Sequence, residues 1–454
     1  MQQWSPDRKN LGGQFLYASM LASVEATGQP VSGVLWYPWW HASGQDIDES
    51  EPAVRNAFCH DCFRSMKGGK PFLMMESTPS QIHWSETSPL RRPGVHRLNG
   101  LQAIAHGSDS VCYFQLRKSR GSCEQWHGAV IDHVGHGETR VFREVSALGA
   151  TLEKLSGVCG GRVPARVAII FDWEVRWAIE GAGLPQNKHK AYVDTVIDHY
   201  AAFWRQGIAL DVIDSESDLT SYDLVVAPML YLLRGDQADR LARFVHQGGT
   251  LVATYLTGLV DATALAFTGG RPGPLAQVLG IWVEESDALP ESSRRQVIAS
   301  TGHAWGLEGV YEARHCCDLL HAKEAEVVAV YGDDFYAGSP AVTRNVHGKG
   351  QAFYIASRND GRFQQDFFSH LAVNLGIPRA LDAALPSGVT AHSRVMDGRH
   401  YLFVLNFKGT ALQFDLKDHS WVDVETGETR SGKVQLDGFG SKVYERRANP
   451  HSQA

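Results

Sequence analysis

The amino-acid sequence predicts an α/β protein that ends in a small antiparallel β module. Apolar runs alternate with helical patterns through residues 164–380, an order typical of a doubly wound parallel sheet. Residues 1–163 contain apolar strands about 35 residues apart, a spacing that suits the βα repeat of a (β/α)8 barrel. Residues 381–454 show only short alternating segments separated by turn dipeptides. The chain therefore divides into three regions.

The first region is predicted to hold strands whose polar ends could form a site. Lys70–Glu76 is an apolar strand that ends on a carboxylate, Arg97–His106 has a helical pattern, and Ser110–Gln115 is a second strand. Because the carboxyl ends of barrel strands line the active site, Glu76 is a candidate nucleophile or acid. The alternative interpretation is a carboxylate paired with a nearby arginine. The sequence pattern alone supports the catalytic carboxylate and the paired carboxylate equally.

The second region has the clearest pattern, with continuous apolar runs of the kind found in strands that are buried on both faces. The predicted strands are Arg166–Phe171, Ile208–Ile213, Tyr222–Ala227, Thr250–Tyr255 and Gln351–Ala356, and the predicted helices are His189–Gln206, Asp236–His246 and Phe363–Leu375. The stretch between residues 256 and 350 is expected to be irregular.

The third region is predicted to form antiparallel strands. They are His400–Phe407, Leu412–Leu416, Ser420–Val424, Lys433–Leu436 and Lys442–Glu445. No helical pattern and no chemically suggestive group of residues accompanies them.

Composition excludes several classes of protein. With 454 residues, about three domains are expected. The net charge of −7 argues against binding to nucleic acid or to an anionic membrane surface. No apolar stretch is long enough to predict a transmembrane helix, and no secretory signal is expected at the N-terminus. Seven cysteines, an odd number without a regular framework, favour the reducing cytoplasm.

Aromatic and polar residues near Glu76 indicate the kind of ligand. Trp84 follows it closely, Glu124 and His127 are three residues apart, and Tyr37 lies in a cluster of aromatic residues. Aromatic rings with carboxylates, and no phosphate-binding loop, fit a neutral carbohydrate better than a nucleotide.

Neither a metal nor a cofactor is expected. Cys59-His60-Asp61-Cys62 has the CxxC spacing, but no second pair follows at the distance of a zinc ribbon. The segment Ala53–Met66 that contains it has an amphipathic helical pattern, which favours a packed helix.

Many short segments, in order, resemble the β-galactosidases of glycoside hydrolase family 42. These segments are Lys67–Phe72, Glu76–Gln81, Arg92-Pro93-Gly94, Ala105-His106-Gly107, Gln115–Gly121, Glu124 with His127-Gly128-Ala129, Thr139–Glu144, Phe171–Glu174, Ala227–Tyr231 and Asp334–Gly338. The resemblance extends over nearly the whole chain after about residue 30.

The resemblance implies an organisation and an activity. Residues 1–163 would be the C-terminal part of a TIM-barrel catalytic domain, residues 164–380 a doubly wound trimerisation domain, and residues 381–454 a β-sandwich. The protein would be a homotrimer that hydrolyses terminal β-D-galactosides with retention. Glu76 would be the nucleophile, Trp84, Glu124 and His127 would contact galactose, and Tyr37 would be the tyrosine of the sixth barrel strand.

The sequence also departs from the family pattern. The family's general acid/base is a glutamate in an Asn-Glu pair on the fourth barrel strand, and this chain contains no Asn-Glu dipeptide. The first five or so strands and the family's cysteine zinc cluster have no counterpart either. A truncated gene, a wrongly assigned start and one half of a split protein are the alternatives. Accordingly, the chain could be a galactosidase that keeps only the nucleophile, a non-catalytic trimeric scaffold or sugar-binding fragment, or one subunit of a split enzyme.

Overall fold

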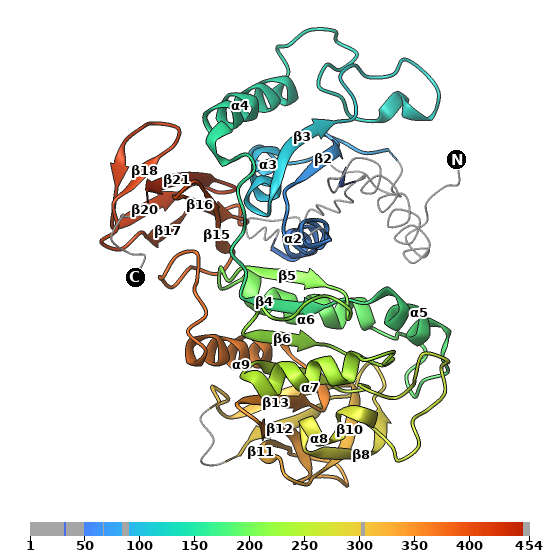
Figure 1. Ribbon diagram of the computed structural model, residues 1–454. Coiled ribbons are helices and arrows are strands. Elements are labelled where there is room, and N and C mark those ends of the chain that lie inside the picture. The colour runs from blue at the N-terminus through green and yellow to red at the C-terminus, as the bar shows by residue number, and fades with distance from the viewer. Residues whose placement is uncertain (1–30, 33–49, 67, 84–89, 301–304, 448–454) are drawn as a thin grey trace. The chain divides into compact units, whose positions relative to one another are not determined.

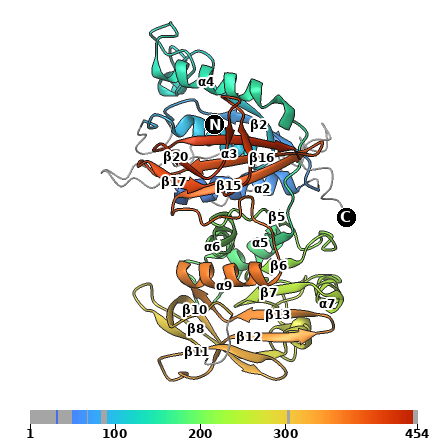
Figure 2. The ribbon, with the colours of Figure 1, turned by 90° about the vertical axis from the view of Figure 1, so that its left-hand side faces the viewer.

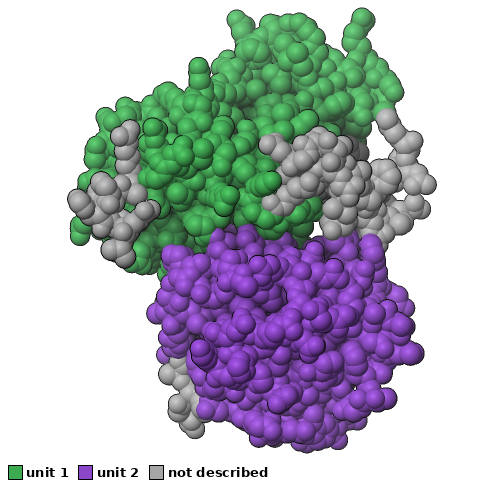
Figure 3. All heavy atoms as spheres, viewed as in Figure 1, with its two compact units in different colours: residues 1–164, 205–209, 379–454 green, residues 165–204, 210–378 purple. Residues whose placement is uncertain are grey.

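The computed structural model describes residues 31–32, 50–66, 68–83, 90–300 and 305–447 (Figure 1). The chain forms two compact units (Figure 3). The first contains residues 1–164, 205–209 and 379–454, and the second contains residues 165–204 and 210–378. Within the described ranges, no helix is both long and apolar enough to cross a membrane.

The first unit contains a parallel sheet of three strands, in the order β1 (Val31–Ser32), β2 (Phe72–Ser77) and β3 (Ser108–Tyr113). Helix α2 (Ser50–Ser65) precedes β2, and α3 (Val95–Ala105) connects β2 to β3. A strand, a helix and a parallel strand form the repeating unit of a (β/α)8 barrel. The predicted partial barrel is therefore confirmed.

Helix α4 (Arg140–Lys154) follows a long loop after β3. Thr139 begins it, because its hydroxyl oxygen accepts a hydrogen bond from the backbone N–H of Phe142 at 3.3 Å. The helix packs on α3 at Gly100, where a Cβ would lie 2.6 Å from a methyl group of Leu148. The glycine thus permits the two helices to approach closely.

The C-terminal module of the first unit consists of two antiparallel sheets. The larger sheet has the order β15 (Val389–Met396), β16 (Arg399–Asn406), β21 (Ser441–Arg447), β18 (Trp421–Asp423) and β19 (Thr429–Arg430), and the smaller one pairs β17 (Leu412–Asp415) with β20 (Lys433–Leu436). Both sheets contribute to one apolar core, which includes Leu402, Phe414 and Tyr444. Strands of the larger sheet pack against α3, as Figure 2 shows. The predicted antiparallel module is confirmed, whereas the three-part division of the chain stays a prediction.

The second unit is built on one large mixed sheet. Its parallel part has the order β5 (Leu210–Ile213), β4 (Val167–Ile170), β6 (Leu224–Ala227), β7 (Thr250–Thr254) and β13 (Gly350–Ile355). Helices α6 (Tyr192–Trp204) and α9 (Gly361–Asn374) pack together, and α7 (Gln237–Gln247) packs on β7 and β13. The predicted doubly wound sheet is thus confirmed. Helices α5 (Trp173–Gly181) and α8 (Ala276–Leu279) complete the described helices of this unit.

The expectation of an irregular stretch between residues 256 and 350 is wrong. This segment adds antiparallel strands beyond β13, namely β12 (Pro340–His347), β11 (Glu326–Tyr331), β9 (Arg295–Ala299), β10 (Val310–Ala322) and β8 (Ile281–Ala288), with β14 (Ser357–Asn359) paired to β10. These strands have one face buried, so apolar residues alternate with charged ones: Ile281 and Val283 are buried, but Trp282 and Glu284 are exposed. A search for continuous apolar runs overlooks such alternation.

Candidate active site

The candidate active site lies at the carboxyl ends of β2 and β3. The strands are parallel, so the segments that follow them begin at one edge of the sheet. We call residues 78–83 the β2 loop and residues 114–139 the β3 loop. Glu76 stands near the end of β2 with its side chain half-buried. Burial, and secondly the charge of Glu124, raises the pKa of the Glu76 carboxyl.

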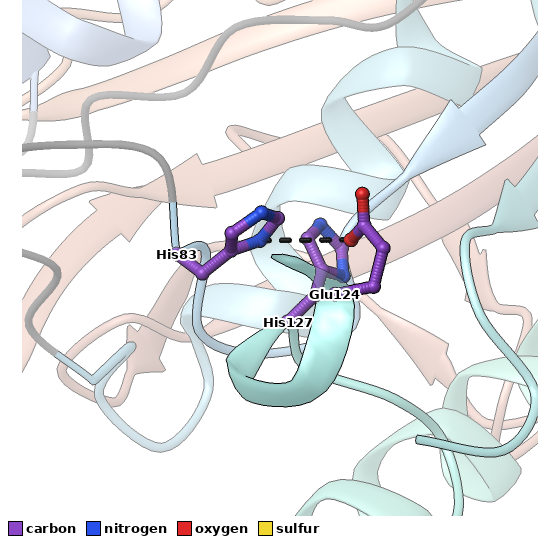
Figure 4. Close-up of side chains that lie close together, drawn as sticks. All are labelled: His83, Glu124 and His127. Carbon is purple, nitrogen blue, oxygen red and sulfur yellow. Dashed lines mark ion pairs between the residues drawn. The ribbon is translucent and has the colours of Figure 1, made fainter. Parts of the chain in front are cut away.

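The β3 loop contributes Glu124 and His127 from a short 3-10 helix, η2 (Cys123–Trp126), which His127 terminates. Residues three apart in a 3-10 helix project on the same side, which explains why these two side chains lie together. Figure 4 shows His83, from the β2 loop, facing them. Nδ1 of His83 lies 3.6 Å from Oε2 of Glu124, and the nearest ligand atoms of all three side chains are within 4.8 Å of one another.

The orientation of His127 is set by its neighbours. Its Nδ1 lies 2.9 Å from the carbonyl oxygen of Gly128, and since a carbonyl only accepts hydrogen bonds, Nδ1 carries the proton. Burial lowers the pKa of His127, which favours the neutral ring. Nε2 then presents its lone pair, 3.4 Å from the hydroxyl of Thr78. The ring of Phe114 packs edge-on against it, with 5.1 Å between ring centroids.

The two loops are held together by backbone contacts. The N–H of Gly128 donates a 2.6 Å hydrogen bond to the carbonyl of Gln81. A Cβ at Gly128 would lie 2.4 Å from the hydroxyl oxygen of Ser80 and 2.8 Å from the backbone nitrogen of Gln81. The approach therefore requires glycine. Arg91 adds a hydrogen bond from its guanidinium to the carbonyl of Thr78.

The structure brings together three of the five predicted site residues: Glu76, Glu124 and His127. Trp84 and Tyr37 lie outside the described residues. No arginine is among the groups that shift the pKa of Glu76 in the described residues, and the choice between a catalytic and a paired carboxylate stays a prediction. Sequence reasoning missed His83. Its only sequence signal is its place directly before Trp84, in a loop that has no periodicity.

The CxxC segment belongs to a packed helix, as its pattern predicts. Cys59 and Cys62 lie in α2, and burial raises the pKa of their thiols to about 11 and about 12. Thiols bind metal as thiolates, which these environments disfavour. Asp61 between them pairs with Arg64 at 2.9 Å and with His106 at 3.0 Å. Over the ranges that the structure describes, His83, Glu124 and His127 are the one group of three side chains placed to hold a metal ion.

In (β/α)8 barrels the catalytic groups stand at the carboxyl ends of the strands, and most glycoside hydrolases use carboxylates for catalysis, so the position of Glu76 fits this class of enzyme. Residues 17–155 match the family described as β-galactosidase, and residues 165–378 match the β-galactosidase trimerisation domain. Together the two matches extend over most of the chain, which belongs to glycoside hydrolase family 42.

Similar proteins and structures extend over most of this chain. It is 47% identical over 411 residues to β-galactosidase Pbg of Clostridium perfringens and 48% identical over 412 residues to β-galactosidase BglY of Alicyclobacillus acidocaldarius. These matches include 90% and 91% of the chain but only 59% of either relative. A β-galactosidase structure from Rahnella sp. R3 has a TM-score of 0.87 at 50% identity, over 91% of this chain and 59% of that one. A catalytic mutant of Gan42B from G. stearothermophilus has a TM-score of 0.88 at 38% identity, over 94% of this chain and 60% of that one.

Proposed function

We propose that the chain carries the nucleophile side of a retaining β-galactosidase site, which acts on terminal β-D-galactosides. The observation that carries this proposal is the position of Glu76, half-buried at the carboxyl end of a barrel strand and electrostatically coupled to Glu124. Family membership supplies the sugar, since the relatives described above are β-galactosidases. Because the chain spans about three fifths of those relatives, the activity is proposed for it and not transferred outright.

In the proposed mechanism the Glu76 carboxylate attacks the anomeric carbon as the bond to the leaving oxygen breaks. The product is a galactosyl ester of Glu76, and water releases galactose from it in a second step. Glu124 would accept hydrogen bonds from sugar hydroxyls, and the Nε2 lone pair of His127 would do the same. Trp84 and Tyr37 are proposed as further galactose contacts.

Proton transfer to the leaving group needs a second carboxyl, about 5–5.5 Å from the nucleophile. The sequence contains no Asn-Glu pair to supply it. Without that acid, hydrolysis of a galactoside with a sugar leaving group should be slower by a factor of roughly 10²–10⁴. An activated leaving group that needs no protonation should suffer less.

The test is therefore a 2,4-dinitrophenyl β-galactoside mixed with the purified chain. We expect a stoichiometric burst of dinitrophenol and a galactosyl adduct on Glu76 by intact mass and peptide mapping. Glu76→Gln should abolish both, and Glu138→Gln, a change of an exposed carboxylate in the β3 loop, should leave both intact. No burst from the folded wild-type chain, or an unchanged burst from Glu76→Gln, would refute the assignment.

A second proposal concerns assembly. The match of residues 165–378 to the trimerisation domain supports a homotrimer, and the cysteine pattern keeps the cytoplasm as the expected compartment. Analytical ultracentrifugation should give three times the chain mass.

The alternative function is a non-catalytic trimeric scaffold or sugar-binding fragment, or one subunit of a split enzyme. It is favoured by the β1–β2–β3 sheet, which has three strands in the described residues whereas a closed barrel has eight. A trimer without a burst would favour this alternative.

A further inference from the structure

Two polar atoms in the candidate site face each other without a hydrogen-bond partner in the described residues. They are Nδ1 of His83 and Oε2 of Glu124, and both are inaccessible to solvent. The two atoms form a long ion pair of 3.6 Å, drawn as a dashed line in Figure 4, and this distance is too long for a direct hydrogen bond. Unsatisfied buried polar atoms are rare in native proteins, and an ion or a water molecule between them is a common explanation. A small ligand held between the two side chains would satisfy both atoms.

The spacing of the ligand atoms suits a small metal ion. In a tetrahedral zinc site, with bonds of about 2.0–2.2 Å, neighbouring ligand atoms are about 3.4 Å apart. The 3.6 Å separation between His83 and Glu124 is close to that value, and every ligand-atom distance that includes His127 lies within 4.8 Å. Rotation of the partly exposed side chains of His83 and Glu124 could close the remaining gap, since their exposed fractions are 17% and 31%.

Groups behind the ligands support the same interpretation. Metal-binding histidines usually donate their second ring N–H to a carbonyl or a carboxylate, which fixes the tautomer. His127 makes this bond to the carbonyl of Gly128, so its Nε2 carries the lone pair that a metal would need. The long 3.4 Å hydrogen bond that Nε2 accepts from the Thr78 hydroxyl would have to give way to the metal. The close contact between Gly128 and the β2 loop in turn holds the histidines near each other.

We infer that His83, Glu124 and His127 form a binding site for a divalent transition-metal ion, with Zn²⁺ the best match. Two imidazole nitrogens and one carboxylate oxygen are ligands that zinc accepts, whereas calcium and magnesium require oxygen-rich sites. Three protein ligands leave a fourth position open for water or another oxygen ligand. The site's single carboxylate also neutralises part of the metal's charge.

The metal would occupy the space that the proposed function assigns to sugar hydroxyls. This part of the inference rests on the proposed function, in which Glu124 and His127 contact galactose. A bound Zn²⁺ would withdraw both side chains from the sugar, and its positive charge would lower the reactivity of the nearby Glu76 carboxylate. Transition metal and galactoside should therefore compete, so that metal acts as a reversible inhibitor at the sugar site itself.

Binding is tested first with the metal alone. The metal-free chain is titrated with Co²⁺, and the visible absorption of tetrahedral cobalt is recorded, followed by displacement with Zn²⁺. We expect one site per chain with nitrogen and oxygen ligands, and at least a ~tenfold loss of affinity in His83→Gln and in Glu124→Gln. The matched control is His321→Gln in the second unit. His321 pairs with Glu284 at 2.6 Å on an exposed sheet face and belongs to no group of three ligands, so its loss should change nothing.

The results separate the metal site from the sugar site. Equal Co²⁺ affinity in the wild type and both variants would overturn the inference, as would a spectrum dominated by thiolate-to-metal charge transfer from the free cysteines. Among the described residues Nδ1 of His83 has no hydrogen-bond partner, so His83→Gln is expected to fold, and circular dichroism checks this. Competition is read from the rate of Glu76 labelling, which Zn²⁺ should slow in the wild type but not in His83→Gln. Metal binding without slower labelling would overturn the overlap and the proposed sugar contacts, while the metal site itself would stand.

Discussion

Replacing Arg394 by methionine should destabilise the first unit without affecting the second. Arg394 lies on β15 with its side chain fully buried. Its guanidinium donates hydrogen bonds to the carbonyls of Ile104, Ser108 and Gly161, at 3.2, 2.9 and 2.8 Å, and to the carboxylate of Asp109 at 2.7 Å. One side chain of the C-terminal module thus holds the end of α3, the start of β3 and the segment after α4.

The expected cost follows from what the substitution leaves behind. Methionine fills similar space but donates nothing, so a carboxylate and three carbonyls each lose one donor. The Asp109 carboxylate keeps its hydrogen bond from the backbone N–H of Gly160, and the Ile104 carbonyl keeps the one from Gly107. Removing one member of a buried ion pair costs about 3–5 kcal/mol. The Asp109 carboxylate is 20% exposed and can recruit water, which places the estimate at the lower end of about 3–5 kcal/mol. For a unit of this size, a loss of about 3 kcal/mol should lower the midpoint of thermal unfolding by roughly 6–12 °C.

The assay is thermal unfolding combined with hydrogen exchange, resolved by peptide. Exchange should accelerate in α3, β3 and β15, while β4, β6 and β7 keep their protection. The control is Arg399→Met on the adjacent strand. Its ion pair with Glu445 is 3.4 Å long and partly exposed, so its loss should change stability little. If Arg394→Met unfolds within a degree of Arg399→Met, with unchanged exchange in α3, the side chain does not hold the module to the barrel strands and the reasoning is wrong.

Three further predictions concern the site and the second unit. Gly128→Ala should lower the free energy of unfolding by about 1–3 kcal/mol, because the added methyl group overlaps the β2 loop. The expected result is faster proteolysis of the β3 loop, and an unchanged rate would contradict the prediction. Labelling of Glu76 should slow as the pH falls below the raised pKa of its carboxyl, since only the carboxylate form attacks. Glu124→Gln removes a neighbouring negative charge, so it should lower the pKa of Glu76 and move the loss of labelling to lower pH. An unchanged pH profile in this variant would exclude the coupling between the two carboxylates. Asp318→Ala should destabilise the second unit by about 3–5 kcal/mol, because it leaves the buried Arg271 without the carboxylate that pairs with it at 3.0 Å. In calorimetry the unfolding transition of the second unit should move to lower temperature, while that of the first unit stays unchanged.

The sequence predicted strands well where burial alone determines which residue types they contain. Strands β4, β6 and β7 are buried along their whole length, so their apolar runs are continuous and unmistakable. Strand β15 was missed because its buried residues include Thr390, His392 and Arg394. Thr390 and His392 satisfy each other with a 3.0 Å hydrogen bond, whereas Arg394 is satisfied by partners more than 200 positions away in the sequence, which no local pattern records.

The same distinction applies to the site. Glu76 could be predicted because a strand end in a barrel has a fixed relation to the active site. The spacing of Glu124 and His127 indicated a shared face only once the segment was known to be a 3-10 helix. His83 had no such signal, since its position depends on two loops that meet through Gly128.

The link between α3 and the C-terminal module also sets an order of events during synthesis. Arg97 on α3 donates a hydrogen bond to Ser441, a residue 344 positions later. At about 5–20 residues per second, the ribosome needs roughly 20–70 s to make the intervening chain. Residues 165–378 can emerge and bury their core in that interval. The barrel strands meanwhile wait with one face of α3 uncovered, so chaperones that shield apolar surface should bind nascent chains that end before β15 more than the completed protein.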